Sequence, residues 1–171
     1  MKAAVQRRPA PSNLVATACP STQTTLRYPP DGVRGVATVV RAAGYGTHYN
    51  DYRVESKTTL LSIIQIESAE SVKNVGEIAA VDGVGVLFVG PMGLSTSLGI
   101  FRQCGHPPFI DALNKTLTVA RRNNRAARIL PPGAGTTHHY RDMGFRFITA
   151  GTDVLLLKTA ASQLAWDLRE A

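Results

Sequence analysis

The sequence predicts an α/β fold built around a parallel β-sheet. Two short apolar runs, at 60–66 and 84–89, are separated by a stretch in which apolar residues recur at helical spacing. Strands this apolar, joined by a helix, are typical of parallel sheets that are buried on both faces. Each run ends in glycine or polar residues, which is the position where an α/β barrel builds its active site. These observations together favour a sheet of the barrel type.

The length of the chain limits how much of a barrel it can form. A complete eight-stranded α/β barrel typically needs about 250 residues, and the chain has 171. That length still suits one domain with a sizeable core. The order of strand and helix patterns indicates about four β/α units in succession, and these imply right-handed crossovers. We therefore expect a partial (β/α)8 barrel.

The elements are predicted from local patterns along the chain. Pro29 and Pro30 stiffen an extended segment, and Asp31-Gly32 marks a tight turn. The stretch 33–45 is expected to form a short helix or a loop. Ser68 has the character of a helix N-cap. The expected strands are 60–67, 84–89, 127–130 and 145–150, and the expected helices are the one that follows Ser68 and those at 108–123, 138–143 and 159–169.

The N-terminal residues differ in composition from the rest. Residues 1–26 include basic residues but no acidic ones, a composition that transit peptides share. Pro9 and Pro11 interrupt any helix there, so we predict an irregular leader at 1–26 and one domain at 27–171. Cys19 and Cys104 have neither metal-like spacing nor a framework of disulfide partners. A reduced, cytoplasmic setting is expected, with mitochondrial targeting as the alternative.

The net charge of +7 raises the question of a nucleic-acid partner. The densest basic cluster, Arg121, Arg122, Arg125 and Arg128, follows the end of an expected helix, where cations interact favourably with the helix dipole. Aromatic residues make up only 6% of the chain and none lies within this cluster. We interpret the cluster as a solvated helix end and do not expect nucleic-acid binding. No apolar run approaches the roughly 18 residues of a membrane span.

One pair of polar residues stands out as a candidate site. Gln65 and Glu67 flank Ile66, so the alternation of a strand places both side chains on the same face. They come at the end of an otherwise apolar run, which favours a functional role over a surface one.

Other candidates have simpler explanations. His138 and His139 are adjacent on an expected helix and point about 100° apart, so they are unsuited to sharing one metal ion. We expect His106 to shape the turn before a helix. Asp153 either faces the site or caps the terminal helix, and we favour the cap.

Four segments carry a resemblance to a known family. They are RYPPDGVRG at 27–35, IIQIESAESVKNVGEIAAVDGV at 63–84, LFVGPMGLSTSLG at 87–99 and YRDMGFRFITAGTD at 140–153. The chain resembles the HpcH/HpaI aldolase/citrate lyase family, in particular its 2-oxo-3-deoxy sugar acid and 4-hydroxy-2-oxoheptanedioate aldolases. The resemblance runs from about residue 26 to the C-terminus and corresponds to strands five to eight of that family's barrel.

The resemblance implies a function and a site. These class II aldolases use a divalent metal, usually magnesium, manganese or cobalt, to cleave 2-oxo acids into pyruvate and an aldehyde. It implies that Glu67 is a metal ligand and that Gln65 contacts the bound 2-oxo acid. It further implies that the substrate carboxylate is held by the backbone of a polar loop, made of Gly90, Pro91, Met92, Gly93, Leu94 and Ser95.

The sequence also departs from the family pattern. Gly93 stands where the family has an aspartate that binds the metal, and Gly85 stands where aspartate is usual. The family's histidine and arginine of the active site belong to the strands without a counterpart here. We therefore expect weak or absent aldolase activity. The alternative is a non-catalytic binding or assembly protein that retains the half-barrel.

A half-barrel also predicts self-association. Its first and last strands are left as sheet edges, and exposed edges invite pairing with another chain. The resemblance implies oligomers in which the terminal helix packs onto a neighbour, with Leu164 and Trp166 as anchors. A homo-oligomer is expected.

Overall fold

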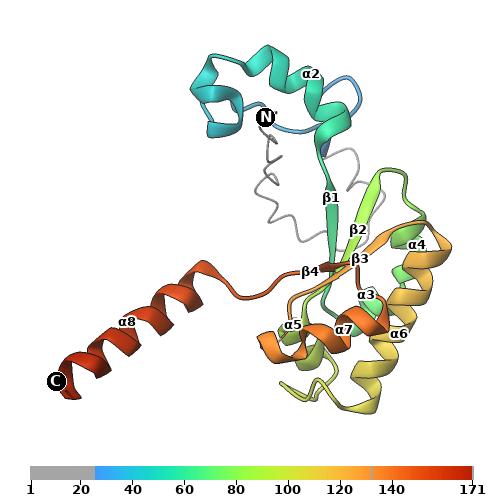
Figure 1. Cartoon of the computed structure of the whole chain (residues 1–171). Helices are drawn as coiled ribbons and strands as arrows, with labels where there is room; N and C mark the ends of the chain where they lie inside the picture. The colour runs from blue at the N-terminus through green and yellow to red at the C-terminus, as the bar shows by residue number, and fades with distance from the viewer. Residues whose placement is uncertain (1–25, 132, 171) are drawn as a thin grey trace, which may run out of the picture.

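The computed structural model describes residues 26–131 and 133–170, and these form one four-stranded parallel sheet with its helices (Figure 1). The leader predicted at 1–26 therefore lies outside the described residues, except for Leu26. The strands lie in the order β1-β2-β3-β4, and every neighbouring pair is parallel. This confirms the predicted β/α succession. The strands are β1 Ser62–Ile66, β2 Val84–Val89, β3 Ala126–Ile129 and β4 Phe147–Ile148.

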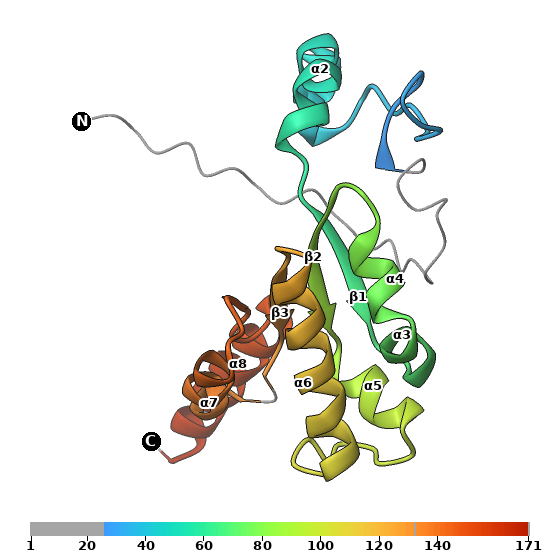
Figure 2. The same ribbon diagram turned by 90° about the vertical axis from the view of Figure 1, so that its right-hand side faces the viewer.

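Helices pack against one face of this sheet. The two that cover its centre are α4 (Val75–Ala80), which contacts β2, and α6 (Pro107–Arg122), which contacts β2 and β3 (Figure 2). The other described helices are η1 Arg41–Gly46, α2 Tyr49–Thr59, α3 Ala69–Lys73, α5 Pro91–Ser97, η2 Ala134–Thr136, α7 Thr137–Met143 and α8 Asp153–Glu170.

The hydrophobic core lies between the sheet and these helices. Cross-strand partners such as Ile64 and Leu87, and Ile66 and Val89, point to this side and are buried. On α6 the apolar residues recur at helical spacing, so that one stripe faces the sheet. The buried residues of that stripe are Phe109, Ala112, Leu113, Thr116, Leu117 and Ala120.

The opposite face of the sheet, which we call the open face, carries the residues that alternate with the core residues. The register aligns Gln65 of β1 with Phe88 of β2, then with Arg128 of β3 and Phe147 of β4. In a complete barrel this face is the interior. The candidate residue Gln65 therefore belongs to the barrel interior.

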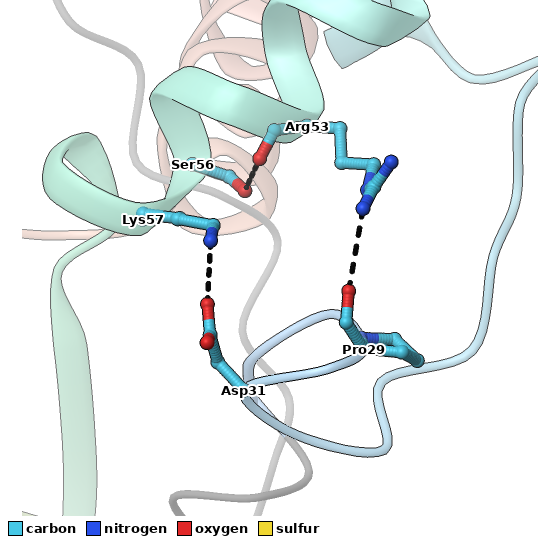
Figure 3. Close-up of polar contacts among 5 residues, drawn as sticks. All are labelled: Pro29, Asp31, Arg53, Ser56 and Lys57. Carbon is cyan, nitrogen blue, oxygen red and sulfur yellow. Dashed lines mark hydrogen bonds and ion pairs between the residues drawn. The ribbon is translucent and has the colours of Figure 1, made fainter.

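The segment 27–34 is docked onto α2, as Figure 3 shows. Lys57 pairs with Asp31 at 2.6 Å, and Arg53 donates a hydrogen bond of 3.4 Å to the Pro29 carbonyl. The Tyr28 ring is buried and packs edge-on against two tyrosine rings of α2. This segment therefore forms a layer with α2 beyond the N-terminal end of β1.

Several boundaries differ from the predicted ones. No element was predicted at α2, because its sequence has no apolar stripe: Ser56 is its one buried residue and Val54 is 69% exposed. The helix predicted after Ser68 is two helices, α3 and α4, with a break at Asn74. Ser68 itself is the N-cap that the sequence predicted, in a capping box with Ser71.

The last strand and the last helix were also misplaced. The strand predicted at 145–150 shortens to Phe147–Ile148, although the Arg146 and Thr149 amides still donate to β3 carbonyls at 3.2 and 3.1 Å. The helix predicted at 159–169 begins six residues earlier, at Asp153. Figure 1 shows α8 projecting away from the sheet. No described helix is long and apolar enough to cross a membrane.

The interpretation of the arginine cluster as a solvated helix end holds for two of its members and is wrong for the other two. Arg121 and Arg122 are exposed in the last turn of α6, whereas Arg125 and Arg128 are partly buried. Arg121 donates to the Met143 carbonyl at 3.0 Å. Arg125 donates to the carbonyls of Ala79 and Val81, at 3.1 and 3.3 Å, and so ties the end of α4 to the start of β3. Arg128 lies on the open face.

Candidate functional site

The candidate site forms at the carboxyl ends of β1 and β2. Glu67 follows directly on β1, and its Oε2 accepts a hydrogen bond of 2.7 Å from Gln65 Nε2. The two side chains therefore share one face, as strand alternation predicted. Both are partly buried. The amide of Gln65 orients the carboxylate of Glu67 toward the start of α5.

Two glycines allow the backbone of the next strand end to approach this pair. A Cβ atom at Gly90 would lie 2.9 Å from Gln65 Nε2, and one at Gly93 would lie 3.0 Å from both Cβ and Oε2 of Glu67. Contacts this short are not tolerated by ordinary side chains without movement. The close approach of α5 to Glu67 therefore depends on the absence of side chains at both positions. The structure brings the predicted residues Gln65, Glu67, Gly90 and Gly93 together.

The predicted polar loop at Gly90–Ser95 is instead the start of a helix, which corrects the sequence interpretation. Pro91 occupies the first turn of α5, where a missing N–H costs nothing. Because the chain turns helical, the Leu94 amide donates to the Gly90 carbonyl at 2.9 Å. The Gly90 amide donates to the carbonyl of Ile66, the last residue of β1, at 3.1 Å. Neither amide is free for a substrate. In this segment only the amides of Met92 and Gly93 precede the helical hydrogen bonds.

The remaining predicted residues of this segment have structural roles. Leu94 is fully buried in the core. Ser95 is also fully buried, and its hydroxyl donates to the Met92 carbonyl at 3.2 Å and accepts from the Arg102 amide at 3.2 Å. Met92 is 47% exposed beside the site.

These residues supply only part of the ligand set that a divalent metal needs. Within the described residues no three side chains of His, Cys, Asp or Glu gather into a metal-binding group. Glu67 offers one carboxylate, and the position opposite it is Gly93. Hard cations such as Mg²⁺ are held by carboxylates together with waters and substrate oxygens. The described residues therefore do not fit a complete metal site, although Glu67 can supply one ligand.

The other candidates lie on helices or at helix starts. His138 and His139 are exposed on α7. His106 precedes α6 at its N-cap position. At the start of α8 the Thr152 hydroxyl accepts from the Leu155 amide at 3.2 Å, and Asp153 accepts from the Val154 amide at 2.8 Å. The favoured role of Asp153 as the helix cap is therefore wrong, because Thr152 is the capping residue and Asp153 is the first residue of α8.

Sequence reasoning missed Arg128 as a residue of this region. Its register places it on the same face as Gln65, with Phe88 between them. The available signal was an arginine inside an otherwise apolar stretch of four residues, AARI, because a cation within a buried strand needs a reason.

The fold and the site together define a class. A parallel sheet with helices on one face, and with polar side chains at the carboxyl ends of its strands, is part of a (β/α)8 barrel with its site at the usual end. Residues 15–160 match the HpcH/HpaI aldolase/citrate lyase family. The chain belongs to this family.

Individual relatives agree with this assignment. The chain is 37% identical over 139 residues to a 5-keto-4-deoxy-D-glucarate aldolase of Escherichia fergusonii, a match covering 81% of this chain and 54% of the relative. A namesake from Escherichia coli O6:H1 is 35% identical over 141 residues, covering 82% and 55%. The chain thus spans about half the length of the curated relatives it matches.

Solved structures show the same relationship. A family protein from Burkholderia cenocepacia aligns with a TM-score of 0.72 at 37% identity, covering 84% of this chain and 57% of the other. An HpcH/HpaI aldolase from Desulfitobacterium hafniense aligns with a TM-score of 0.71 at 25% identity, covering 88% and 58%. The described sheet therefore corresponds to one part of a larger barrel in these proteins.

Proposed function

We propose that the chain binds 2-oxo acids at the carboxyl ends of β1 and β2, and that it is an impaired member of the divalent-metal-dependent aldolases. The observation that supports this most is the contact of Glu67 with both Gln65 and the start of α5. Such an arrangement offers a carboxylate, an amide and two backbone N–H groups within one small space. The N–H groups suit the oxygens of a 2-oxo acid, and the carboxylate can supply one ligand to a cation.

The individual roles follow from the chemistry of each group. Glu67 would supply one anionic ligand for magnesium, manganese or cobalt, and such a cation would act there as a Lewis acid. Gln65 orients Glu67 and contacts the oxo acid. The amides of Met92 and Gly93 face the substrate carboxylate, because oriented N–H groups at a chain turn favour an anion.

Impairment is part of the proposal. A second carboxylate at position 93 would share the cation with Glu67, but glycine offers only its backbone. One anionic ligand holds a hard cation weakly in the absence of substrate. Aldol cleavage is therefore expected to be slow, with pyruvate and an aldehyde as products.

A non-catalytic binding or assembly protein is the second candidate. The observation in its favour is α8, whose described residues are all exposed although they include Leu156, Leu164 and Trp166. Apolar side chains that the described residues leave exposed on a helix favour packing onto another copy. A homo-oligomer in the cytoplasm is part of both candidates.

An activity assay separates the two. Pyruvate release from a 4-hydroxy-2-oxo acid is measured with Mn²⁺ for the wild-type chain and for Gly93→Asp, with Gly93→Asn as the matched uncharged variant. The proposal predicts low activity that Asp raises and Asn does not. Folded proteins that show neither metal-dependent release nor oxo-acid binding would favour the non-catalytic candidate.

A further inference from the structure

Arg128 is held on the open face of the sheet by aromatic and polar neighbours. Its guanidinium carbon lies 4.1 Å from the ring centroid of Phe88 and 4.8 Å from that of Phe147, on the two flanking strands. Its Nε donates a hydrogen bond of 3.0 Å to the Thr149 hydroxyl. The head group of Arg128 is therefore positioned by β2, by β4 and by the residue that follows β4.

The same head group keeps most of its hydrogen-bonding capacity. A guanidinium carries five N–H donors, and of these the described residues engage only the one on Nε. No carboxylate of the described chain lies within ion-pair distance of it. Burial lowers the pKa of Arg128 from its usual value, because removing a cation from water has a cost. A partly buried, positioned and unpaired cation is suited to an anionic ligand.

The register places this cation beside the candidate site. Gln65, Phe88 and Arg128 are successive cross-strand partners, so they point to the same side at the same level of the sheet. Neighbouring strands lie about 4.8 Å apart, which puts the backbone of Arg128 about 10 Å from that of Gln65. The guanidinium lies over Phe88, two residues before Gly90, and a small ligand can bridge that separation.

We infer that Arg128 binds the remote carboxylate of a dicarboxylic 2-oxo acid whose oxo end lies at Glu67 and Gln65. This inference rests on the proposed function. The oxo end is assigned to the β1–β2 end because Glu67 and Gln65 are there, and the opposite end of an extended diacid then lies toward β3. A planar guanidinium can hold that carboxylate through two parallel N–H···O bonds.

The test compares two acids of equal length. 2-Oxoglutarate and 2-oxopentanoate differ only in the remote carboxylate, and calorimetry with Mn²⁺ on the full chain measures both. We expect the wild type to bind 2-oxoglutarate at least about tenfold more tightly, in keeping with a charged hydrogen bond. Arg128→Met should lose this preference while its affinity for 2-oxopentanoate stays the same. Arg128→Lys should retain part of the preference, and the exposed-site control Arg122→Met should retain all of it.

The outcomes that would contradict the role of Arg128 can be told apart from the one that would contradict the proposed function. Equal wild-type affinity for the two acids overturns the role of Arg128 and leaves the proposed function standing. A preference that survives in folded Arg128→Met, checked by circular dichroism, also overturns it. Binding of neither acid contradicts the proposed function itself, and this inference with it.

Discussion

The backbone at Gly93 lies so close to Glu67 that a Cβ atom there would be 3.0 Å from the Cβ and the Oε2 of Glu67, and 3.2 Å from its carbonyl oxygen. Two of these three atoms belong to the fixed part of Glu67, so a side chain at position 93 can be accommodated only by a local shift. An aspartate at this position would also bring its carboxylate beside that of Glu67. Gly93 therefore sets both the packing and the charge of the site.

Gly93→Asp should make the stability of the chain depend on metal. Without metal, crowding against Glu67 and repulsion between two carboxylates should lower the free energy of unfolding by about 1–3 kcal/mol. With Mn²⁺, the two carboxylates gain a common ligand, and binding to the folded state should recover stability. Thermal unfolding in EDTA and in millimolar Mn²⁺ measures both effects.

Gly93→Asn is the matched control for charge. It should lose stability through the same crowding against Glu67, and it should not regain that stability when Mn²⁺ is added. A Gly93→Asp protein whose melting temperature is the same with EDTA and Mn²⁺ would contradict the placement of the second ligand beside Glu67.

Arg125 should contribute to stability where its neighbour Arg122 does not. Arg125→Ala leaves the carbonyls of Ala79 and Val81 without their side-chain donor, which should cost about 1–3 kcal/mol. Arg122→Ala removes an exposed side chain and should change stability by less than about 0.5 kcal/mol. Urea denaturation of both variants measures the difference. Equal effects would mean that the two hydrogen bonds of Arg125 add nothing.

The docking of the segment 27–34 should weaken in acid. A hydrogen bond from Lys57, together with its charge, lowers the pKa of Asp31 below its usual value. The folded pKa is thus below the unfolded one, so the contribution of Asp31 is complete above the usual pKa of aspartate and is lost as the pH falls through the lowered value. Protection from hydrogen exchange at Asp31 and its neighbours, relative to the intrinsic rate at each pH, should fall over that range. Asp31→Asn should abolish the pH dependence, and an unchanged pH profile in that variant would refute the assignment.

Self-association should depend on α8. Its exposed apolar residues include Leu164 at 61% and Trp166 at 60% exposure. We expect light scattering after size exclusion to show a mass above that of one chain, and Leu164→Ser combined with Trp166→Ser to reduce it. A stable wild-type monomer at micromolar concentration would contradict this prediction.

The sequence was sufficient to predict the sheet and the polar pair at its end. The strands of an α/β barrel are buried on both faces and therefore give continuous apolar runs that are easy to recognise, and two residues around Ile66 are placed on one face by alternation alone. The N-cap at Ser68 could also be predicted, because a serine before a helical stripe has a specific hydrogen-bonding role. These features depend on local geometry.

Features that depend on tertiary contacts were missed. The sequence of α2 shows no aliphatic stripe, because tyrosine rings and the polar groups of Arg53 and Lys57 make its contacts to residues 27–34. The helix α5 was taken for a loop, since glycine and proline are typical of loops, although proline is also favoured in the first turn of a helix, where Pro91 lies. Arg125 and Arg128 were assigned to solvent because their partners, backbone carbonyls and aromatic rings, are far away in the sequence.

The most direct test of the central claim is calorimetry of pyruvate binding in the presence of Mn²⁺, with the wild-type chain and Glu67→Ala. The account places the oxo-acid site at Glu67, so it predicts weak wild-type binding that Glu67→Ala abolishes and Glu67→Asp partly retains. Pyruvate binding that is tight and unaffected by Glu67→Ala would contradict it.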